Sequence, residues 1–333
     1  MEFNKILVTG SSGFIGTHLI SHLSGHDCTV IGLDIRQPLS TNFANHVNCD
    51  LLDREQLINT IRDIEPDAIV HLAARTDLNG YSVDDYLANS LGVANLIQAI
   101  RETPSVKRCL FTSSQLVCKV GYIPQGDKDY CPPNAYGESK VLTEQAVRSE
   151  DGGDITWCLF RPTTIWGGGM NDHYASFFNR LKRGQYFHPG KQDLYKSYGY
   201  VGNTVFQIYQ FLEAPSESIH RQVYYLADYV PISLPVWINA IAAGLGRKHP
   251  PVVPLFLCRG LSLVGDLFRY AGLEKYFPLN SFRLNNILTQ YTYDMTKTKN
   301  ICGALPNNFE EGVAALVAWI NRTQNESHQV QLR

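Results

Sequence analysis

Residues 8–19 read VTGSSGFIGTHL and directly follow KIL, a mostly apolar run at residues 5–7. The glycines fall at Gly10, Gly13 and Gly16, which gives the spacing G-x-x-G-x-x-G. When such a loop joins a strand to a helix, backbone N–H groups and the helix N-terminus point at one anion, and glycine lets a pyrophosphate approach closely. The stretch therefore predicts a dinucleotide-binding loop between a strand and a helix.

Asp34 strengthens this interpretation, because it lies 18 residues after Gly16 and ends the next apolar run, VIGL at residues 30–33. A carboxylate at that place accepts hydrogen bonds from a ribose 2′-OH. Arg36 lies close enough to suit a 2′-phosphate instead, but Asp34 would repel that phosphate. We therefore predict NAD rather than NADP, with an ordinary strand-end turn as the alternative role of Asp34.

Short apolar runs alternate with helical patterns along the first half of the chain. The predicted strands cover residues 6–9, 29–34, 68–72, 108–113 and 156–161, and the clearest helices cover 14–23, 86–100 and 135–148. This alternation predicts an α/β fold with a doubly wound parallel sheet. We expect this first domain at residues 1–167, a smaller mixed α/β substrate-binding part at 168–322 with some elements returning to the first domain, and a disordered polar tail at 323–333.

Composition narrows the class of protein. The 333 residues include 44% hydrophobic residues, enough for a large core, and the net charge of −2 gives no sign of a nucleic-acid partner. The longest apolar stretch, residues 252–268, is interrupted by Arg259 and Asp266, so we expect a buried helix and no membrane partner. A strand that begins at residue 5 leaves no room for a signal peptide, which predicts a cytoplasmic protein. The eight cysteines form no C-x-x-C pair, and no metal site is predicted.

A second motif, Tyr136-Gly137-Glu138-Ser139-Lys140, places tyrosine and lysine four residues apart on a predicted helix. The two side chains then share one face, so the ammonium can favour the phenolate and lower the tyrosine pKa. Ser113 and Ser114 follow the strand at 108–113, where a hydroxyl can reach the same substrate oxygen. The pattern is typical of an acid/base site, although most such pairs simply form a solvated helix face.

With these motifs the chain resembles the extended short-chain dehydrogenase/reductase superfamily, and within it the NAD-dependent epimerase/dehydratase family that acts mainly on nucleotide sugars. The shared segments are TGSSGFIG at residues 9–16, Asp34, Asp50-Leu51, HLAA at 71–74, Asn89 with Gly92 and Asn95-Leu96, Ser113-Ser114, Tyr136 with Lys140, and Arg161-Pro162. The resemblance implies a Rossmann-type fold and covers roughly the first half of the chain closely.

The resemblance also implies roles for individual residues. Ser114, Tyr136 and Lys140 would be catalytic, with Lys140 also holding the nicotinamide ribose, Asp50 and Leu51 flanking the adenine, and Ala73 lying along the cofactor. The expected NAD-binding set is Gly10, Gly13, Phe14, Ile15, Gly16, Asp34, Asp50, Leu51, Ala73, Ala74, Asn89, Ser113, Tyr136, Lys140, Arg161 and Pro162. His71 and Asn89 have simple structural alternatives, a core histidine at a strand end and a polar helix residue.

Departures from the family pattern restrict the reaction. Ser114 is followed by Gln115-Leu116 where dehydratases of the family carry an Asp-Glu pair, which argues against a dehydratase. Three further segments are atypical: Val117-Cys118-Lys119, Thr164 in place of the usual asparagine, and Tyr200-Val201-Gly202-Asn203. The substrate candidates are Ser114, Thr164 and Arg283, the last for a diphosphate, with a surface arginine as the equal alternative. Cys118 is expected in the core rather than at the sugar.

The expected reaction is epimerisation of a nucleotide sugar through a keto sugar, with Tyr136 as the acid/base and Ser114 bonded to the same oxygen. Two other enzymes fit the same motifs, an NAD(P)H-dependent reductase of 4-keto nucleotide sugars and a 3β-hydroxysteroid-type dehydrogenase. Asp34 favours the epimerase, and the missing membrane anchor argues against the steroid enzyme. A cofactor-sensing regulator is disfavoured by the intact Ser114, Tyr136 and Lys140.

Two predicted helices suggest a homodimer. In the superfamily the helix that carries Tyr136 and the helix near residues 86–100 commonly pair with their symmetry mates. Here both helices bear apolar residues on more than one face, whereas a surface helix needs only one apolar stripe. These residues are Leu87, Leu91, Ala94, Ile97, Val141, Leu142 and Ala146.

Overall fold

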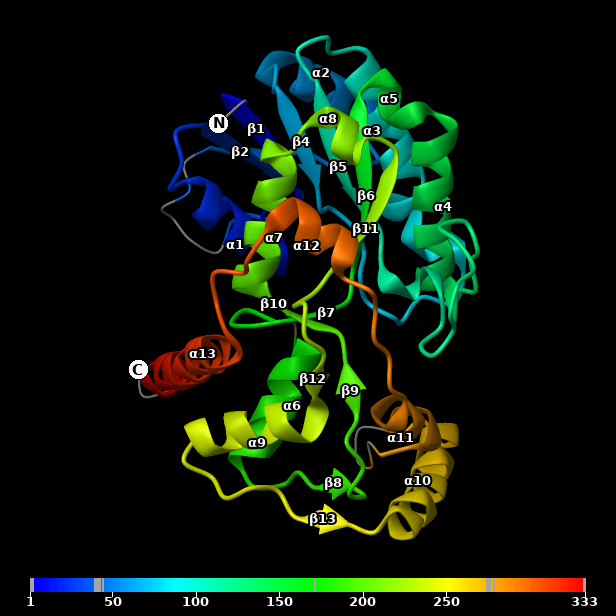
Figure 1. Ribbon diagram of the computed structural model, residues 1–333, viewed down its shortest axis with the longest axis vertical. Coiled ribbons are helices and arrows are strands. Elements are labelled where there is room, and N and C mark those ends of the chain that lie inside the picture. The colour runs from blue at the N-terminus through cyan, green and yellow to red at the C-terminus, as the bar shows by residue number, and fades with distance from the viewer. Residues whose placement is uncertain are drawn as a thin grey trace. The chain divides into compact units, whose positions relative to one another are not determined.

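The computed structural model describes residues 3–38, 43, 45–170, 172–273, 277 and 279–331, which fall into two compact units (Figure 1). The first unit comprises Met1–Ile165, Gly199–Tyr229 and Asp294–Pro306, and the second comprises Trp166–Tyr198, Val230–Tyr293 and Asn307–Arg333. Two late segments thus belong to the first unit, and they add one strand of its sheet and three helices.

A parallel sheet of seven strands forms the centre of the first unit, in the order β11-β6-β5-β4-β1-β2-β3. The strand bounds are β1 Lys5–Thr9, β2 Thr29–Asp34, β3 His46–Asn48, β4 Ala68–His71, β5 Arg108–Thr112, β6 Thr156–Pro162 and β11 Gln222–Leu226. The five predicted strands match β1, β2, β4, β5 and β6 to within one residue at each end. The strand order reverses direction between β1 and β4, which is where doubly wound sheets bind ligands.

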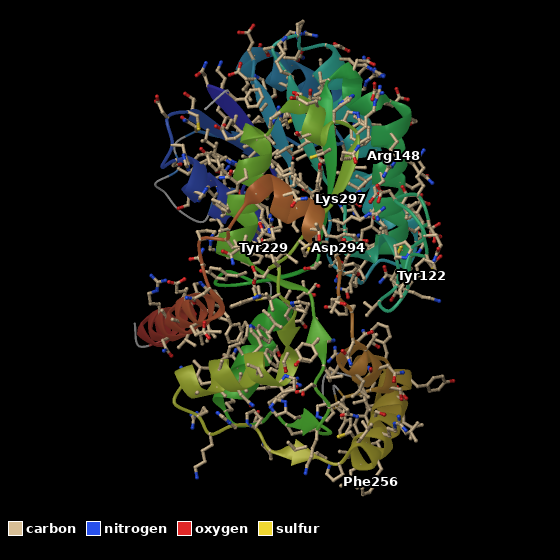
Figure 2. All side chains as sticks on the ribbon, viewed as in Figure 1. Tyr122, Arg148, Tyr229, Phe256, Asp294 and Lys297 are labelled. Carbon is tan, nitrogen blue, oxygen red and sulfur yellow. The ribbon has the colours of Figure 1, made fainter. Side chains whose placement is uncertain are left out.

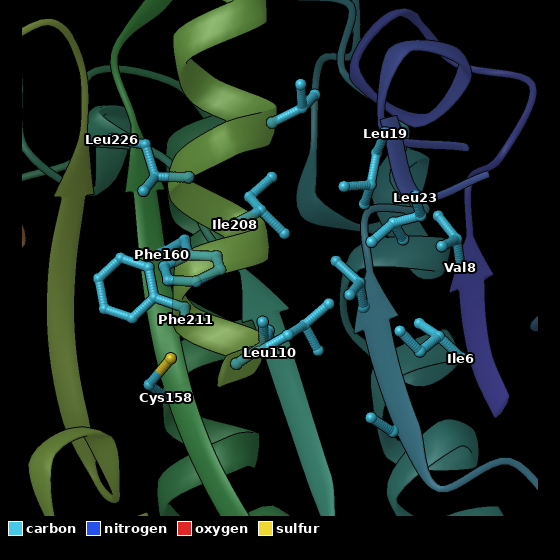
Figure 3. Close-up of a cluster of buried hydrophobic side chains, with 14 of the residues drawn as sticks. Ile6, Val8, Leu19, Leu23, Leu110, Cys158, Phe160, Ile208, Phe211 and Leu226 are labelled. Atoms are coloured by element: carbon cyan, nitrogen blue, oxygen red, sulfur yellow. The ribbon is translucent and has the colours of Figure 1, made fainter. Parts of the chain in front are cut away.

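Both faces of this sheet are buried, as the alternation of side chains along β1 shows. Ile6 and Val8 enter one apolar cluster, whereas Leu7 enters another on the opposite face. The first cluster, drawn in Figure 3, also contains Leu110 and Phe160 from the neighbouring strands β5 and β6. A strand buried on both faces reads as a continuous apolar run, which explains why the sequence pattern located these strands well.

Helices cover each face of the sheet. The cluster with Ile6 and Val8 is closed by α1, α7 and α12, and the cluster with Leu7 by α2, α3 and α4. Their bounds are α1 Phe14–Leu23, α2 Arg54–Ile64, α3 Leu91–Arg101, α4 Ala135–Ser149, α7 Val201–Glu213 and α12 Thr296–Cys302. Shorter elements complete the unit, namely η1 Val83–Asn89, η2 Gln115–Val117, α5 Asp151–Asp154 and α8 Ser216–Ile219.

The helix predicted at residues 86–100 is wrong at its N-terminal end, because the structure breaks this segment into η1 and α3. Tyr86 has non-helical angles of φ −119° and ψ 35°, and Ser90 between the two elements is also distorted. Ser82 and Asp85 form a capping box at the start of η1, so this element begins before residue 86, where the apolar pattern predicts the helix to begin. The segment therefore turns twice before α3 packs on the sheet.

The second unit is built mainly from helices, with aromatic side chains packed around Trp237. Trp166, Phe177, Phe178 and Tyr198 all have ring centroids within 6.3 Å of the Trp237 ring. The helices are α6 Asp172–Lys182, α9 Leu234–Gly244, α10 Leu255–Tyr270, α11 Ser281–Leu288 and α13 Phe309–Gln331. Two pairs of short strands complete this unit: β8 His188–Pro189 pairs with β13 Val252–Val253, and β9 Tyr195–Lys196 pairs with β12 Ile232–Ser233. Two further short strands, β7 Thr164–Trp166 and β10 Tyr198–Tyr200, lie where the chain passes from one unit to the other.

Two expectations for the second half differ from the structure. The buried helix predicted at residues 252–268 is wrong, since α10 exposes Phe256, Leu263 and Leu267 on its outer face. Its burial was inferred from the amount of apolar surface, which says nothing about where that surface points. At the C-terminus α13 continues to Gln331 through residues expected to be disordered, in a stretch free of glycine and proline, and residues 332–333 lie outside the described residues.

Within the described parts of the chain, no helix combines the length and apolar character needed to cross a membrane. The same residues bring together no cluster of three or more His, Cys, Asp or Glu side chains suited to a metal ion.

Candidate active site

The glycine loop lies where β1 ends and α1 begins, at the point where the strand order reverses. Gly10 has a φ of +71°, and a Cβ atom there would lie 2.6 Å from the backbone nitrogen of Ala73. At Gly16 a Cβ atom would lie 2.1 Å from the carbonyl oxygen of Gly10. α1 starts after Gly13 without a side-chain cap, so its N-terminal N–H groups suit a phosphate. Phe14 and Ile15 open that helix.

Asp34 ends β2 and packs against this loop, almost wholly buried. Its carboxylate accepts a hydrogen bond of 3.0 Å from the backbone N–H of Ser12 and another of 2.9 Å from that of Arg36. The Arg36 guanidinium is 3.7 Å from the same carboxylate and projects into solvent. Asp34 is thus held at the loop by local bonds, while its contact with a ribose stays a prediction.

The next predicted cofactor residues, Asp50, Leu51, Ala73 and Ala74, belong to loops of the same unit. The Asp50 carboxylate caps its own turn by accepting from the N–H of Leu52, and the Asn95 side chain donates to the Leu51 carbonyl oxygen at 2.8 Å. The backbone N–H of Ala73 donates to the hydroxyl of Thr9 at 3.3 Å. Together with Gly10, these loops lie after the carboxyl-terminal ends of β1, β3 and β4, and their contact with a dinucleotide stays a prediction.

His71 and Asn89 both have structural partners. The His71 imidazole is fully buried against the Thr9 hydroxyl at 2.8 Å, and burial lowers its pKa to about 3, so the ring is neutral. The Asn89 side chain bonds the backbone N–H and C=O of Arg75 and donates to the Ser139 hydroxyl at 2.9 Å. These contacts use both donors of Asn89 and favour a role in tying η1 to α4, while its expected contact with the cofactor stays a prediction.

The three predicted catalytic residues come from α4 and from the loop that follows β5. Asn134 caps α4 through a 2.9 Å bond to the N–H of Gly137, and a Cβ atom at Gly137 would lie 2.3 Å from the carbonyl oxygen of Leu116. Because Gly137 has no side chain, α4 approaches this loop closely. The Ser114 side chain accordingly lies close enough to the Tyr136 phenol to lower its pKa. All three predicted residues, Ser114, Tyr136 and Lys140, are buried.

The electrostatics of this group differ from the expectation for Tyr136. Burial raises the pKa of Tyr136 to about 12. Tyr86, whose ring centroid lies 5.9 Å away, also raises this pKa, whereas Ser114 lowers it. The Lys140 ammonium donates instead to the carbonyl oxygen of Thr112 at 2.9 Å. The prediction that Lys140 lowers the Tyr136 pKa is therefore wrong for the protein alone, because burial raises this pKa and the interaction that lowers it comes from Ser114.

Lys140 itself carries a perturbed pKa. Burial lowers it to about 8, while the carboxylate of Glu144, one turn further along α4, raises it. A buried lysine with a pKa near neutrality exchanges its proton readily, and strongly shifted groups gather at functional sites. The Thr112 hydroxyl, at the end of β5 near Lys140, is buried and forms no hydrogen bond with any residue that the structure describes, so it is a second polar group at this place.

Glu144 also forms a buried ion pair that sequence reasoning missed. Its carboxylate accepts from the Arg161 guanidinium at 2.7 and 2.9 Å, and from the hydroxyls of Ser113 at 2.8 Å and Tyr130 at 3.0 Å. Ser113 and Arg161, both predicted cofactor residues, are thus engaged with the protein itself, and Pro162 closes β6 beside them. The spacing of Lys140 and Glu144 on one helix face was the available signal.

The substrate candidates are more scattered. Ser114 lies with the catalytic pair and Thr164 lies in β7, whereas Arg283 lies on α11 of the second unit. Cys118 is buried with Val117 and Val141, and burial raises its thiol pKa, as expected for a core residue. The first unit therefore assembles the catalytic and glycine-loop residues without Arg283.

Comparison with known families decides the class of this site. The model of the NAD dependent epimerase/dehydratase family matches residues 6–227, which are two thirds of the chain and include the glycine loop, Asp34, Ser114, Tyr136 and Lys140. The chain belongs to the NAD dependent epimerase/dehydratase family. It is therefore an enzyme of an NAD-dependent family, as its glycine loop and Asp34 predicted, and the Rossmann-type fold is confirmed.

Proteins with sequences similar to this chain have varied activities. A 2-alkyl-3-oxoalkanoate reductase of Stenotrophomonas maltophilia is 24% identical, and the match covers 94% of this chain and 98% of the relative. A 3-beta-hydroxysteroid dehydrogenase of Mycolicibacterium neoaurum is 27% identical over 75% and 73%. An N-acetyl-alpha-D-glucosaminyl-diphospho-ditrans,octacis-undecaprenol 4-epimerase of Escherichia coli O157:H7 is 25% identical over 93% of both chains.

Among solved structures, the UDP-glucose 4-epimerase of Thermus thermophilus in complex with NAD aligns with a TM-score of 0.69 at 22% identity, covering 95% of this family member and 99% of the other chain. At that identity the likeness establishes the shared fold alone. Identical folds carry different reactions, so the reaction has to be argued from the site itself.

Proposed function

We propose that this enzyme is an NAD-dependent epimerase of nucleotide sugars. The observation that carries the proposal is the buried group of Ser114, Tyr136 and Lys140 beside the glycine loop, in a chain that lacks the Asp-Glu pair of the dehydratases at Gln115-Leu116. Enzymes that epimerise by transient oxidation need one acid/base at the reacting oxygen and no group for removing water.

In the proposed reaction Tyr136 exchanges a proton with the sugar hydroxyl, and Ser114 hydrogen-bonds the same oxygen. When bound, oxidised NAD supplies a hydride acceptor and a positive charge close to the phenol. Since the Tyr136 pKa stays near 12 even with Ser114 beside it, the phenol needs such a charge before it acts as a base at neutral pH. Rotation of the keto sugar before its reduction inverts the carbon.

Asp34 supports NAD over NADP in this proposal. Its buried carboxylate is held by the N–H groups of Ser12 and Arg36, so it cannot swing away to admit a phosphate without breaking both bonds. Arg36 is already close to Asp34, which weakens it as a partner for a 2′-phosphate. An epimerase regenerates its cofactor in each cycle, so tight retention of NAD is expected.

Oxidoreduction of a lipid or steroid alcohol is the second candidate, favoured by the similarity to the reductase and to the steroid dehydrogenase. The same three catalytic residues serve that chemistry. The two candidates differ in stoichiometry, because a dehydrogenase or reductase consumes one cofactor for each product and an epimerase consumes none.

The deciding experiment incubates the purified protein with UDP-, GDP-, CDP- and dTDP-sugars, and follows product stereochemistry together with absorbance of the reduced nicotinamide. We expect copurified NAD or NADH, an epimer from one hexose, and no net absorbance change. Stoichiometric use of added NADH or NADPH with a 4-keto sugar, and no epimer, would replace the epimerase by the reductase. Turnover of a hydroxysteroid with none of any sugar would remove the nucleotide-sugar assignment.

A further inference from the structure

Helix α10 of the second unit is amphipathic with its apolar side turned outward. Phe256, Leu263, Leu267 and Tyr270 are 72%, 64%, 70% and 95% exposed. At 100° per residue these four positions fall within about 60° of one another, so they form a single stripe along the helix. Leu257, Leu261 and Val264, each at least 40% exposed, widen the same side. We call these seven residues the α10 face; Figure 2 labels Phe256 near one end of the helix.

The opposite side of α10 holds the polar contacts. The Asp266 carboxylate accepts hydrogen bonds from the backbone N–H and the hydroxyl of Ser281, at the start of α11. Gly265 faces the Leu279 carbonyl oxygen so closely that a Cβ atom would lie 1.8 Å from it. Ser262 and Cys258 are buried on this side as well. The orientation of the helix is therefore set by specific contacts, and it keeps the α10 face away from the unit.

Exposed apolar surface of this size marks a binding surface for a partner or a membrane. The charged residues near the α10 face indicate whether a protein partner or a membrane binds there. Residues 247–283 contain six of the chain's 29 Lys and Arg but only two of its 31 Asp and Glu. Arg247, Lys248 and His249 are exposed before the helix, and Arg259 is exposed beside the stripe. Exposed basic residues before the helix and beside the stripe, together with the aromatic residues of the stripe, suit an anionic lipid surface.

A second copy of the chain is a poorer occupant. Two α10 faces placed together in a twofold contact would bring the basic residues of this segment near their symmetry mates, in a chain whose remaining residues are acidic overall. Insertion across a bilayer is also excluded by length, since 16 residues of helix span about 24 Å and the hydrocarbon core is about 30 Å thick. The helix can lie in the interface but cannot span it.

We propose that the α10 face docks on the surface of an anionic lipid bilayer and holds the enzyme there as a peripheral protein. The proposal departs from the expectation of no membrane partner, which was drawn from the interrupted apolar stretch at residues 252–268. The proposal does not depend on the proposed reaction, because it concerns attachment alone.

Vesicle flotation of the full-length protein tests the proposal. The vesicles are phosphatidylcholine alone, or phosphatidylcholine with about a third phosphatidylglycerol. We expect flotation with the anionic vesicles, weakened by salt, and at least a tenfold lower partition coefficient for Leu263→Glu/Leu267→Glu. The matched control is Ile123→Glu/Val230→Glu, which adds the same charge at two other exposed apolar positions and should bind as the parent does.

Three results would overturn docking through this face. The first is a parent protein that floats with neither vesicle, and the second is an α10 double variant that floats as well as the parent and the control. The third is light scattering in which the α10 variant splits a larger assembly of the parent, which would make the face a contact between copies. Circular dichroism confirms folding of each variant, and because the substituted residues are solvent-exposed, no loss of the fold is expected.

Discussion

Tyr136 is the residue on which the proposed chemistry depends most directly. Tyr136→Phe removes the phenolic oxygen and leaves the ring in its buried place, so turnover should fall by about 10² to 10⁴ while NAD affinity stays nearly unchanged. Steady-state kinetics and cofactor titration measure the two effects separately. The fully exposed Tyr81→Phe serves as the control. Activity of Tyr136→Phe within about tenfold of the parent would exclude an acid/base role.

Lys140 illustrates the cost of a buried charge. Burial lowers its pKa from 10.5 to about 8. Between pH 8 and pH 10.5 the unfolded chain therefore binds more protons than the folded protein, and the free energy of unfolding rises with pH. Below pH 8 the folded protein bears the full free-energy cost of the buried ammonium. The shift corresponds to roughly 3 kcal/mol, partly offset by the lost bond to Thr112 in a Lys140→Met variant. We expect that variant to be inactive yet about 1–2 kcal/mol more stable at pH 7.

Urea unfolding at pH 7 and near pH 10 checks this expectation, and the gain of Lys140→Met should shrink at the higher pH. Lys119→Met, at an exposed lysine, should change stability by less than about 0.5 kcal/mol. If Lys140→Met is less stable than the parent at pH 7, the buried ammonium contributes more through its bonds than it loses through desolvation.

At the scale of elements, α4 is held to β6 by the ion pair of Glu144 and Arg161. Both side chains are inaccessible to solvent, and Arg148 adds only a longer contact of 3.5 Å to Glu144. Arg161→Met leaves the carboxylate buried without its main partner, which should cost about 3–5 kcal/mol. Replacing both residues, as Glu144→Leu/Arg161→Met, should recover much of that loss.

Urea unfolding again provides the measurement, with Arg62→Met as the matched control. Arg62 pairs with Glu102 at 2.9 Å on the surface, where such a pair contributes about 0–1 kcal/mol. A loss below about 1 kcal/mol for Arg161→Met would show that Ser113, Tyr130 and Arg148 satisfy the Glu144 carboxylate without Arg161.

At the scale of the whole molecule, the expected homodimer concerns α3, α4 and η1. Ile97 and Val141 are buried inside the first unit, so they do not serve an interface, whereas Leu87, Leu91 and Leu142 are exposed. We predict that these exposed leucines pair with a second copy, since apolar side chains on adjoining helices offer a self-complementary surface.

Light scattering at micromolar concentration should give twice the mass of one chain. Leu91→Glu/Leu142→Glu should shift the protein to the monomer, while Leu263→Glu/Leu267→Glu on α10 should leave the mass unchanged. A monomeric parent protein would contradict the dimer, without bearing on the docking of α10.

Which of these properties the amino-acid sequence determines depends on how local the interactions are. The strands β1, β2, β4, β5 and β6 were predicted closely, because a strand buried on both faces requires consecutive apolar residues. The glycine loop was equally readable, since Gly10 and Gly16 are required by contacts within the strand–loop–helix unit and with the next strand end. Tyr136 and Lys140 were paired as catalytic candidates because helix geometry places them on one face, and their catalytic role stays a prediction.

Only the tertiary structure decided the rest. Burial reverses the expected direction of the Tyr136 pKa shift, and Glu144 joins Ser113 to Arg161 across 31 and 17 residues of chain. The outward direction of the α10 face likewise depends on Asp266 meeting Ser281 and on the close approach at Gly265. Solvent exclusion and long-range contacts arise when distant segments pack together, so no periodicity or spacing within one segment records them.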